Sequence, residues 1–186
     1  PKWRSMSVSI TQKIVEEFAR QEIARQVKFC QTYFDLTDEW QPYVKLNFSA
    51  RNKASEAGRN VLQKPYMILE LGDYLFPLTG FREYDEYASN MFIGAFKSSD
   101  WQVCLRALIS HELAHCVQFS LPVSESTLRD ATQAEAAFHG LGVYSLGHGA
   151  FFRKIYRVLR QEFVNHHVEE FCMGVMPPKR ISLIGR

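Results

Sequence analysis

The chain has 186 residues, of which 46% are hydrophobic and 23% charged, and its formal net charge at neutral pH is +2. This length suits one domain with a core of its own, and the composition excludes a disordered polyelectrolyte. Because the net charge is so small, attraction to nucleic acid would need a local cluster of Lys and Arg.

The first predicted element is a long helix near the N-terminus. Ser9 and Gln12 form a capping-box pattern, and the apolar residues that follow recur at helical spacing, which predicts a helix over about 10–34.

A small sheet is expected after this helix. Residues 43–48 alternate between apolar and polar side chains, as a half-buried strand does, and residues 66–71 are typical of a more buried strand. Shorter strands are expected near 59–62 and over 90–96.

Helices dominate the second half of the predicted fold. The sequence Ser99-Asp100-Trp101-Gln102 is again a capping-box pattern and opens a helix that Pro122 ends. A second helix is expected over about 127–140, before a glycine-rich connection. The last helix has an apolar stripe at helical spacing, formed by Phe152, Ile155, Tyr156, Leu159 and Phe163.

The cysteines and the hydropathy pattern indicate where such a protein works. Cys30, Cys104, Cys116 and Cys172 contain no C-x-x-C pair, and the first three sit among apolar residues at helical spacing. We expect reduced, mostly buried thiols, which fits an intracellular protein. No apolar run approaches 18 residues, so we expect no membrane-spanning segment.

The most informative motif is His111-Glu112-Leu113-Ala114-His115, an H-E-x-x-H pattern within a predicted helix. Two histidines four residues apart lie on the same side of a helix, one turn above the other, and can bind one Zn²⁺. Glu112 falls at the edge of the apolar stripe, where partial desolvation makes its carboxylate a stronger base. The motif therefore predicts a zinc centre with Glu112 as general base.

A catalytic zinc site needs a third protein ligand, and the residues alone leave several candidates. The short spacing typical of metzincins would place a histidine at position 121, which is a leucine. Glu135 follows His115 at the distance found in thermolysin-like enzymes. His139 and His148 are the other candidates.

One family resemblance distinguishes among these candidates. His148-Gly149-Ala150-Phe151-Phe152 resembles the H-G-x-x-[FW] signature that follows H-E-x-x-H in the SprT-like metalloproteases, the family that includes Spartan. Ala57-Gly58-Arg59 and the strand after it resemble an upstream element of that family, so that the likeness covers about residues 10–165. The resemblance makes His148 the third ligand of the zinc ion, with His111 and His115, and leaves Glu135 as the alternative.

The resemblance also implies a fold and an activity. It implies one α+β domain of zincin type over residues 10–168, with a small mixed sheet packed against helices. Residues 1–9 would be an extension, and residues 169–186 an irregular tail without the zinc ribbon of many family members. The implied activity is zinc-dependent hydrolysis of peptide bonds in DNA-associated or DNA-crosslinked proteins, in the cytoplasm, nucleoid or nucleus.

A cluster of basic residues could bind DNA. Arg153, Lys154, Arg157 and Arg160 are expected together on the polar face of the last helix, beginning one turn after His148. Such a face could bind the phosphates of DNA, more readily single-stranded than duplex, or could simply be a solvated helix surface.

Two rival functions remain open from the sequence. One is a zinc peptidase whose target is unrelated to DNA, with Glu135 as a ligand. The other is a metal-stabilised DNA- or protein-binding module without proteolytic activity.

Overall fold

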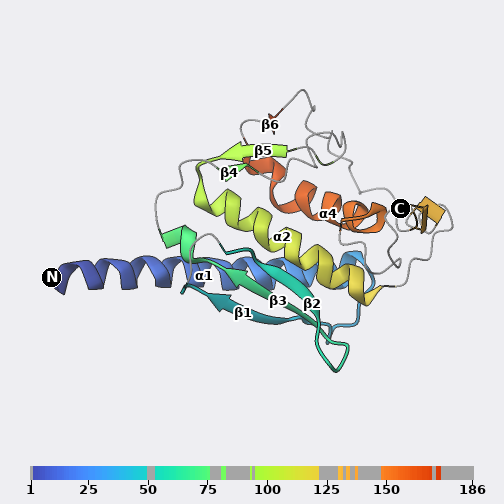
Figure 1. The fold of residues 1–186 in the computed structure, drawn as a ribbon, viewed down its shortest axis with the longest axis horizontal. Coiled ribbons are helices and arrows are strands. Elements are labelled where there is room, and N and C mark those ends of the chain that lie inside the picture. Colours follow the sequence, from blue (N-terminus) through green and yellow to red (C-terminus); the bar gives the residue numbers. More distant parts are fainter. Residues whose placement is uncertain are drawn as a thin grey trace.

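The computed structural model describes residues 2–49, 53–75, 81–82, 93, 95–121, 130–131, 133–134, 137, 148–168 and 171–172. These residues form an α+β fold with helices packed against small sheets, as expected (Figure 1). None of the helices in the described part is both long and apolar enough to cross a bilayer.

Helix α1 (Lys2–Tyr33) begins eight residues before the predicted start, so the expected cap at Ser9 is wrong. The segment contains no glycine or proline after Pro1, and nothing in it interrupts helical hydrogen bonding. The helix ends where Asp35 adopts a left-handed conformation, φ 53°, and the Leu36 N–H donates to the Gln31 carbonyl.

The first sheet has the order β1-β3-β2 and is mixed. Strands β1 (Tyr43–Asn47) and β3 (Pro65–Glu70) pair in parallel and confirm the two main strand predictions. Strand β2 (Glu56–Arg59) pairs antiparallel with β3 and lies three residues before the predicted short strand. The rest of the predicted strand, residues 60–62, instead begins a turn. In this turn the Asn60 side chain accepts hydrogen bonds from the Leu62 and Lys64 N–H groups.

A second group of short strands lies on the other side of α2 (Figure 1). It consists of β4 (Phe81–Arg82), β5 (Ala95–Ser98) and β6 (Phe171–Cys172), with β5 between the other two. The strand expected over 90–96 therefore overlaps β5 only at its end, and most of that range lies outside the described residues. Strand β6 falls in the segment expected to be an irregular tail.

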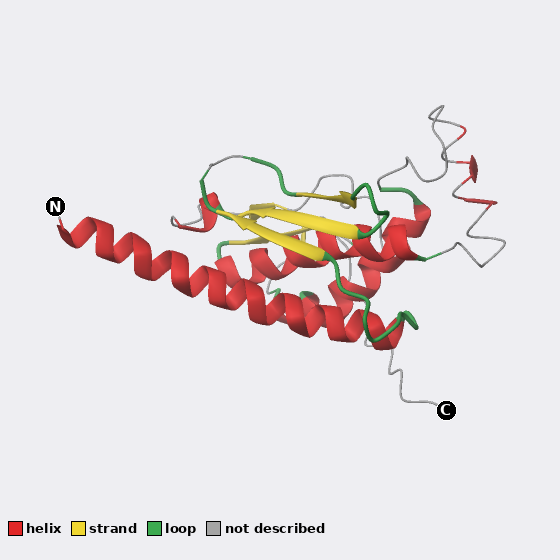
Figure 2. Cartoon of the chain, turned by 90° about the horizontal axis from the view of Figure 1, so that it is seen from below, coloured by secondary structure: helices red, strands yellow, loops and turns green. Residues whose placement is uncertain are grey.

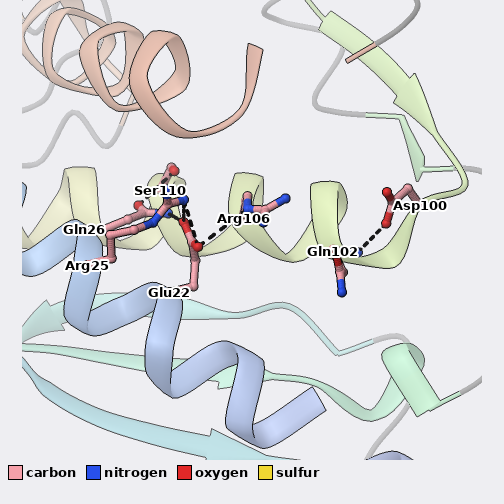
Figure 3. A network of polar contacts seen from close by, with 7 residues as sticks. All are labelled: Glu22, Arg25, Gln26, Asp100, Gln102, Arg106 and Ser110. Atoms are coloured by element: carbon pink, nitrogen blue, oxygen red, sulfur yellow. Dashed lines mark hydrogen bonds and ion pairs between the residues drawn. The ribbon is translucent and has the colours of Figure 1, made fainter. Parts of the chain in front are cut away.

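Helix α2 (Trp101–Ser120) is the centre of the fold and carries the H-E-x-x-H motif. Its cap is Asp100 and not Ser99, because the Asp100 carboxylate accepts from the Gln102 N–H at 2.8 Å (Figure 3). It ends before Pro122 as predicted, with Leu121 in the extended conformation that a following proline favours.

Three neighbours enclose α2. The β1-β3-β2 sheet and α1 lie along it on one side, and α4 (Ala150–Phe163) packs on the other (Figures 1 and 2). Most α2 side chains are therefore buried, polar ones included, and any polar group on this helix must find a partner inside the protein.

On its α1 side, α2 takes part in a polar network around the buried carboxylate of Glu22, formed by Glu22, Arg25, Gln26, Arg106 and Ser110 (Figure 3). The Ser110 hydroxyl donates to the Gln26 side-chain carbonyl at 2.9 Å, and the Gln26 amide donates to the Glu22 carboxylate at 3.0 Å. Arg25 donates to the same carboxylate at 2.7 Å, and the Arg106 guanidinium lies 3.5 Å from it. This network fixes α2 against α1 immediately beside His111.

Candidate metal centre

Helix α2 supplies two imidazoles, as the motif predicted. His111 and His115 are only 4% and 9% exposed, and their ring centroids lie 5.1 Å apart. Both rings point away from the sheet side of α2 toward α4, because both contact Phe152 of α4, with centroid distances of 5.0 and 4.2 Å.

His148 brings the third imidazole from the turn that precedes α4. Its Nε2 lies 3.1 Å from the Nε2 of His111, and its ring centroid lies 5.1 Å from that of His115. One ligand atom from each of the three residues falls within 4.8 Å of the others. The sequence prediction that these three side chains meet is therefore confirmed.

The donor set and spacing suit a metal ion. Nitrogen ligands bound to a tetrahedral zinc at about 2.0 Å lie about 3.3 Å from one another, close to the distance between His111 and His148. Two neutral imidazole nitrogens at 3.1 Å either share one proton or direct both lone pairs at a common cation. Three such rings could hold one metal ion and leave a coordination position open.

Burial keeps the rings of His111 and His115 neutral, which is the state that a metal requires. Desolvation lowers the pKa of His115 to about 4, and it also lowers the pKa of His111 well below its ordinary value. The neighbouring imidazoles lower both values further, because a second positive charge in the cluster would be repelled.

Aromatic side chains form the wall behind the histidines. Phe152 is fully buried and stacks on His115, and its ring also lies 4.8 Å from that of His148. Tyr156, one turn further along α4, lies 5.3 Å from His111. The last residue of the His148–Phe152 motif therefore has a physical role, because it fixes the orientation of the ligand rings and excludes water from behind them.

Gln118 contacts the cluster from outside and was missed by sequence reasoning. Its side-chain oxygen lies 3.3 Å from the Nδ1 of His115, one turn away on α2. A hydrogen bond from Nδ1–H to this oxygen places the free lone pair of His115 on Nε2. The only available signal was the spacing of three residues from a predicted ligand.

Glu112 has the environment expected of a general base. It is 3% exposed, and burial raises the pKa of its carboxyl to about 8, with a further increase from Glu56 of β2. A cation bound to the histidines would lower this pKa again by stabilising the carboxylate. The predicted partial desolvation of Glu112 is confirmed.

The Ala57-Gly58-Arg59 element forms most of β2 and links the sheet to the centre. A Cβ on Gly58 would lie 3.0 Å from the ring of Tyr66, its cross-strand partner, so a larger residue would displace that ring. The Arg59 guanidinium lies 5.9 Å from the centroid of Phe119, whose ring stacks on His115 at 6.2 Å. Strand β2 thus lies next to the metal centre.

The predicted basic face is wrong for Arg160. This side chain is fully buried, with its guanidinium 4.8 Å from the Phe96 ring centroid and its Nε donating to Asn165 at 3.2 Å. It follows the buried Tyr156 by four residues, and burial lowers its pKa to about 9. Arginine accepts such a site because its flat guanidinium stacks on aromatic rings.

The other three basic residues of α4 are not equivalent either. Arg153 is half-buried and donates from a guanidinium nitrogen to the backbone carbonyl of His148 at 2.8 Å. Lys154 is exposed, and Arg157 is half-buried like Arg153. The accessible basic surface of this helix is therefore narrower than the sequence predicted.

The rival ligands Glu135 and His139 lie outside the described residues. The helix predicted over 127–140 is represented by five described residues, all helical and exposed: Asp130, Ala131, Gln133, Ala134 and Ala137.

No family model, curated protein or solved structure matches this chain. What the protein does must therefore be inferred from the residues of the centre itself.

Proposed function

We propose that this protein is a zinc-dependent metallopeptidase of SprT-like type with a zincin-like catalytic domain. The observation that carries the proposal is the convergence of His111, His115 and His148, two of which flank the buried Glu112 on α2. Three imidazoles and one adjacent carboxylate are the protein groups that hydrolysis at a single zinc requires.

His111, His115 and His148 would hold the zinc ion. When bound there, zinc supplies a Lewis acid that lowers the pKa of water and polarises a peptide carbonyl. Glu112 takes a proton from the attacking water and passes it to the leaving nitrogen. Its buried position suits this exchange, because a desolvated carboxylate is a stronger base than an exposed one, and a bound cation would keep it ionised.

Strand β2 suits the binding of an extended protein substrate. Among the strands that the structure describes, β2 has a hydrogen-bonded neighbour on one side only, so its other side is an edge. An edge strand offers backbone donors and acceptors to an incoming chain. Glu56 of β2 raises the pKa of Glu112, which indicates that a peptide paired with this edge would lie near the general base.

Removal of the carboxylate charge of Glu112 tests its role as general base. We expect Glu112→Gln to keep bound zinc and to lower the cleavage of a fluorogenic casein by a factor of about 10²–10⁴. Glu162→Gln, an exposed change of the same kind on α4, is the matched control and should cleave normally. Normal turnover in the zinc-loaded Glu112→Gln protein would contradict the proposal.

The metal ligands are tested separately. Zinc content should fall in His148→Ala and stay unchanged in Glu135→Ala; the reverse would favour the thermolysin-like alternative. If the wild type binds zinc but cleaves neither casein nor itself, with or without single-stranded DNA, the protein is a metal-stabilised binding module instead.

We further propose that the natural substrates are DNA-associated or DNA-crosslinked proteins. The family resemblance supports this proposal. Of the α4 cluster, Lys154 is exposed and Arg157 is half-buried, whereas Arg153 donates to the His148 carbonyl and Arg160 is buried, so Lys154 and Arg157 are the candidates for phosphate contacts.

Salt-dependent binding tests the role of these two side chains. Neutralising both should reduce the slope of log affinity against log salt for single-stranded DNA by about 1.4, the value for two phosphate contacts. An unchanged slope would exclude this surface.

A further inference from the structure

The three candidate ligands differ in how their backbones are held. His111 and His115 lie within α2, where helical hydrogen bonds fix them. His148 lies in a turn before α4, separated from the helix by Gly149, an N-cap residue without a side-chain hydrogen bond. The direction of the third imidazole therefore depends on contacts that hold this turn.

Arg153 makes two such contacts from the first turn of α4. Its backbone N–H donates to the Gly149 carbonyl at 3.0 Å, as in any helix. Its guanidinium also donates to the His148 carbonyl at 2.8 Å, a charge-assisted hydrogen bond that fixes one residue further back. Phe152, the residue before Arg153, holds the His148 ring at 4.8 Å. The backbone and the ring of His148 are thus both held by the first turn of α4.

We propose that Arg153 is a positioning residue of the metal centre, whose hydrogen bond to the His148 carbonyl fixes the third imidazole for metal binding. This inference rests on the proposed metal site. It gives Arg153 a role different from the phosphate contact that its sequence neighbourhood suggested.

The charge of Arg153 and its hydrogen bond have opposite effects on metal affinity. The direction in which affinity changes in a variant therefore shows which of the two matters. A positive charge near a cation site opposes metal binding, so removing the charge alone would raise metal affinity. Removing the hydrogen bond frees the turn that carries His148 and would lower metal affinity. A lower affinity in a variant without the guanidinium therefore cannot come from the charge.

The experiment is a titration of the metal-free protein with Co²⁺, without nucleic acid, followed by its visible absorption. Arg153→Met keeps the apolar stem of the side chain and loses the donor. We expect it to bind Co²⁺ on the order of tenfold more weakly and, at saturation, to show an altered ligand-field spectrum. Lys154→Met removes the same charge from the next residue and should show the wild-type spectrum with equal or slightly higher affinity.

Several outcomes would overturn the inference. An Arg153→Met protein with wild-type affinity and spectrum would do so, as would an equal loss in Lys154→Met. If Arg153→Met does not fold, Arg153→Leu, which also lacks a donor, replaces it with the same expected and overturning results. A wild type that binds no Co²⁺ would overturn the proposed metal site itself, which distinguishes the two failures.

Discussion

Helix α2 presents one buried polar cluster to α1 and another to α4, and the two are built in opposite ways. In the polar network toward α1, donors meet acceptors and the carboxylate of Glu22 meets two guanidinium groups (Figure 3). In the cluster toward α4, three imidazoles face one another, with two ring nitrogens 3.1 Å apart. Neutral imidazole nitrogens gathered in this way suit the binding of one shared cation.

The contrast separates residues that hold the fold from residues that could bind a metal ion. Ser110 and His111 are neighbours in sequence and almost equally buried, yet one belongs to each cluster. Changes in the polar network should lower stability and leave metal affinity nearly unchanged. Changes in the histidine cluster should lower metal affinity without lowering the stability of the metal-free protein, because functional sites gather buried polar groups at a cost to stability.

The largest expected effect comes from removing the third imidazole. His148→Ala should weaken zinc binding on the order of 10³-fold, because one of three protein ligands is lost. The thermal midpoint of the metal-free protein should change little, since His148 lies in a partly exposed turn. Competition titration with a chromogenic chelator measures the affinity, and exposed His166→Ala is the control. Equal affinities in the two variants would remove His148 from the site.

The next effect concerns the pH dependence of stability. A carboxyl whose pKa rises from 4.5 to about 8 on folding contributes full stability below pH 4.5, and this contribution is lost as the pH rises to 8. Glu112→Gln removes that loss, so the metal-free variant should be more stable than the wild type by about 4 kcal/mol at pH 8, and by little at pH 4. Urea unfolding at both pH values measures the difference, and a constant difference would contradict the assignment.

Breaking the polar network should have a somewhat smaller effect. Glu22→Ala removes the hydrogen-bond acceptor of the buried Gln26 amide and the ion-pair partner of Arg106, and should lower the free energy of unfolding by about 2 kcal/mol. Glu16→Ala, which removes an exposed ion pair with Arg20 on the same helix, should change it by less than about 0.5 kcal/mol. Similar losses in the two variants would show that the network adds no more than a surface pair.

The smallest effect is the coupling between Ser110 and Gln26. Each single change, Ser110→Ala or Gln26→Leu, leaves one polar partner buried and should cost about 1 kcal/mol. The double variant should cost less than the sum of the two, by at least about 0.5 kcal/mol. Additive losses would mean that the hydrogen bond does not connect the helices energetically.

The sequence predicted the centre well where chemistry fixes the spacing. The helical repeat places His111 and His115 on one side, and Glu112 at the edge of an apolar stripe. The prediction of His148 as a ligand needed more than helical spacing, because no local rule connects a residue of a turn to a helix 33 positions earlier in the chain. The motif around it selected it, and the structure shows why the motif ends in Phe152.

Sequence reasoning failed where tertiary contacts override local pattern. Arg160 counted as polar in the helical pattern, but stacking on Phe96 makes it part of the interior. The Gln26–Ser110 bond joins residues 84 positions apart, and nothing in the sequence pairs them. The start of α1 was misplaced because Ser9 has the composition of a cap but lies within a helix that nothing interrupts.

X-ray absorption at the zinc edge of the zinc-loaded protein shows directly whether three imidazoles gather around one metal ion. We expect one zinc per chain, with nitrogen or oxygen neighbours at about 2.0 Å and the outer-shell scattering of three imidazole rings. Sulfur neighbours at about 2.3 Å, a signal from fewer imidazoles, or a protein that retains no zinc would contradict it.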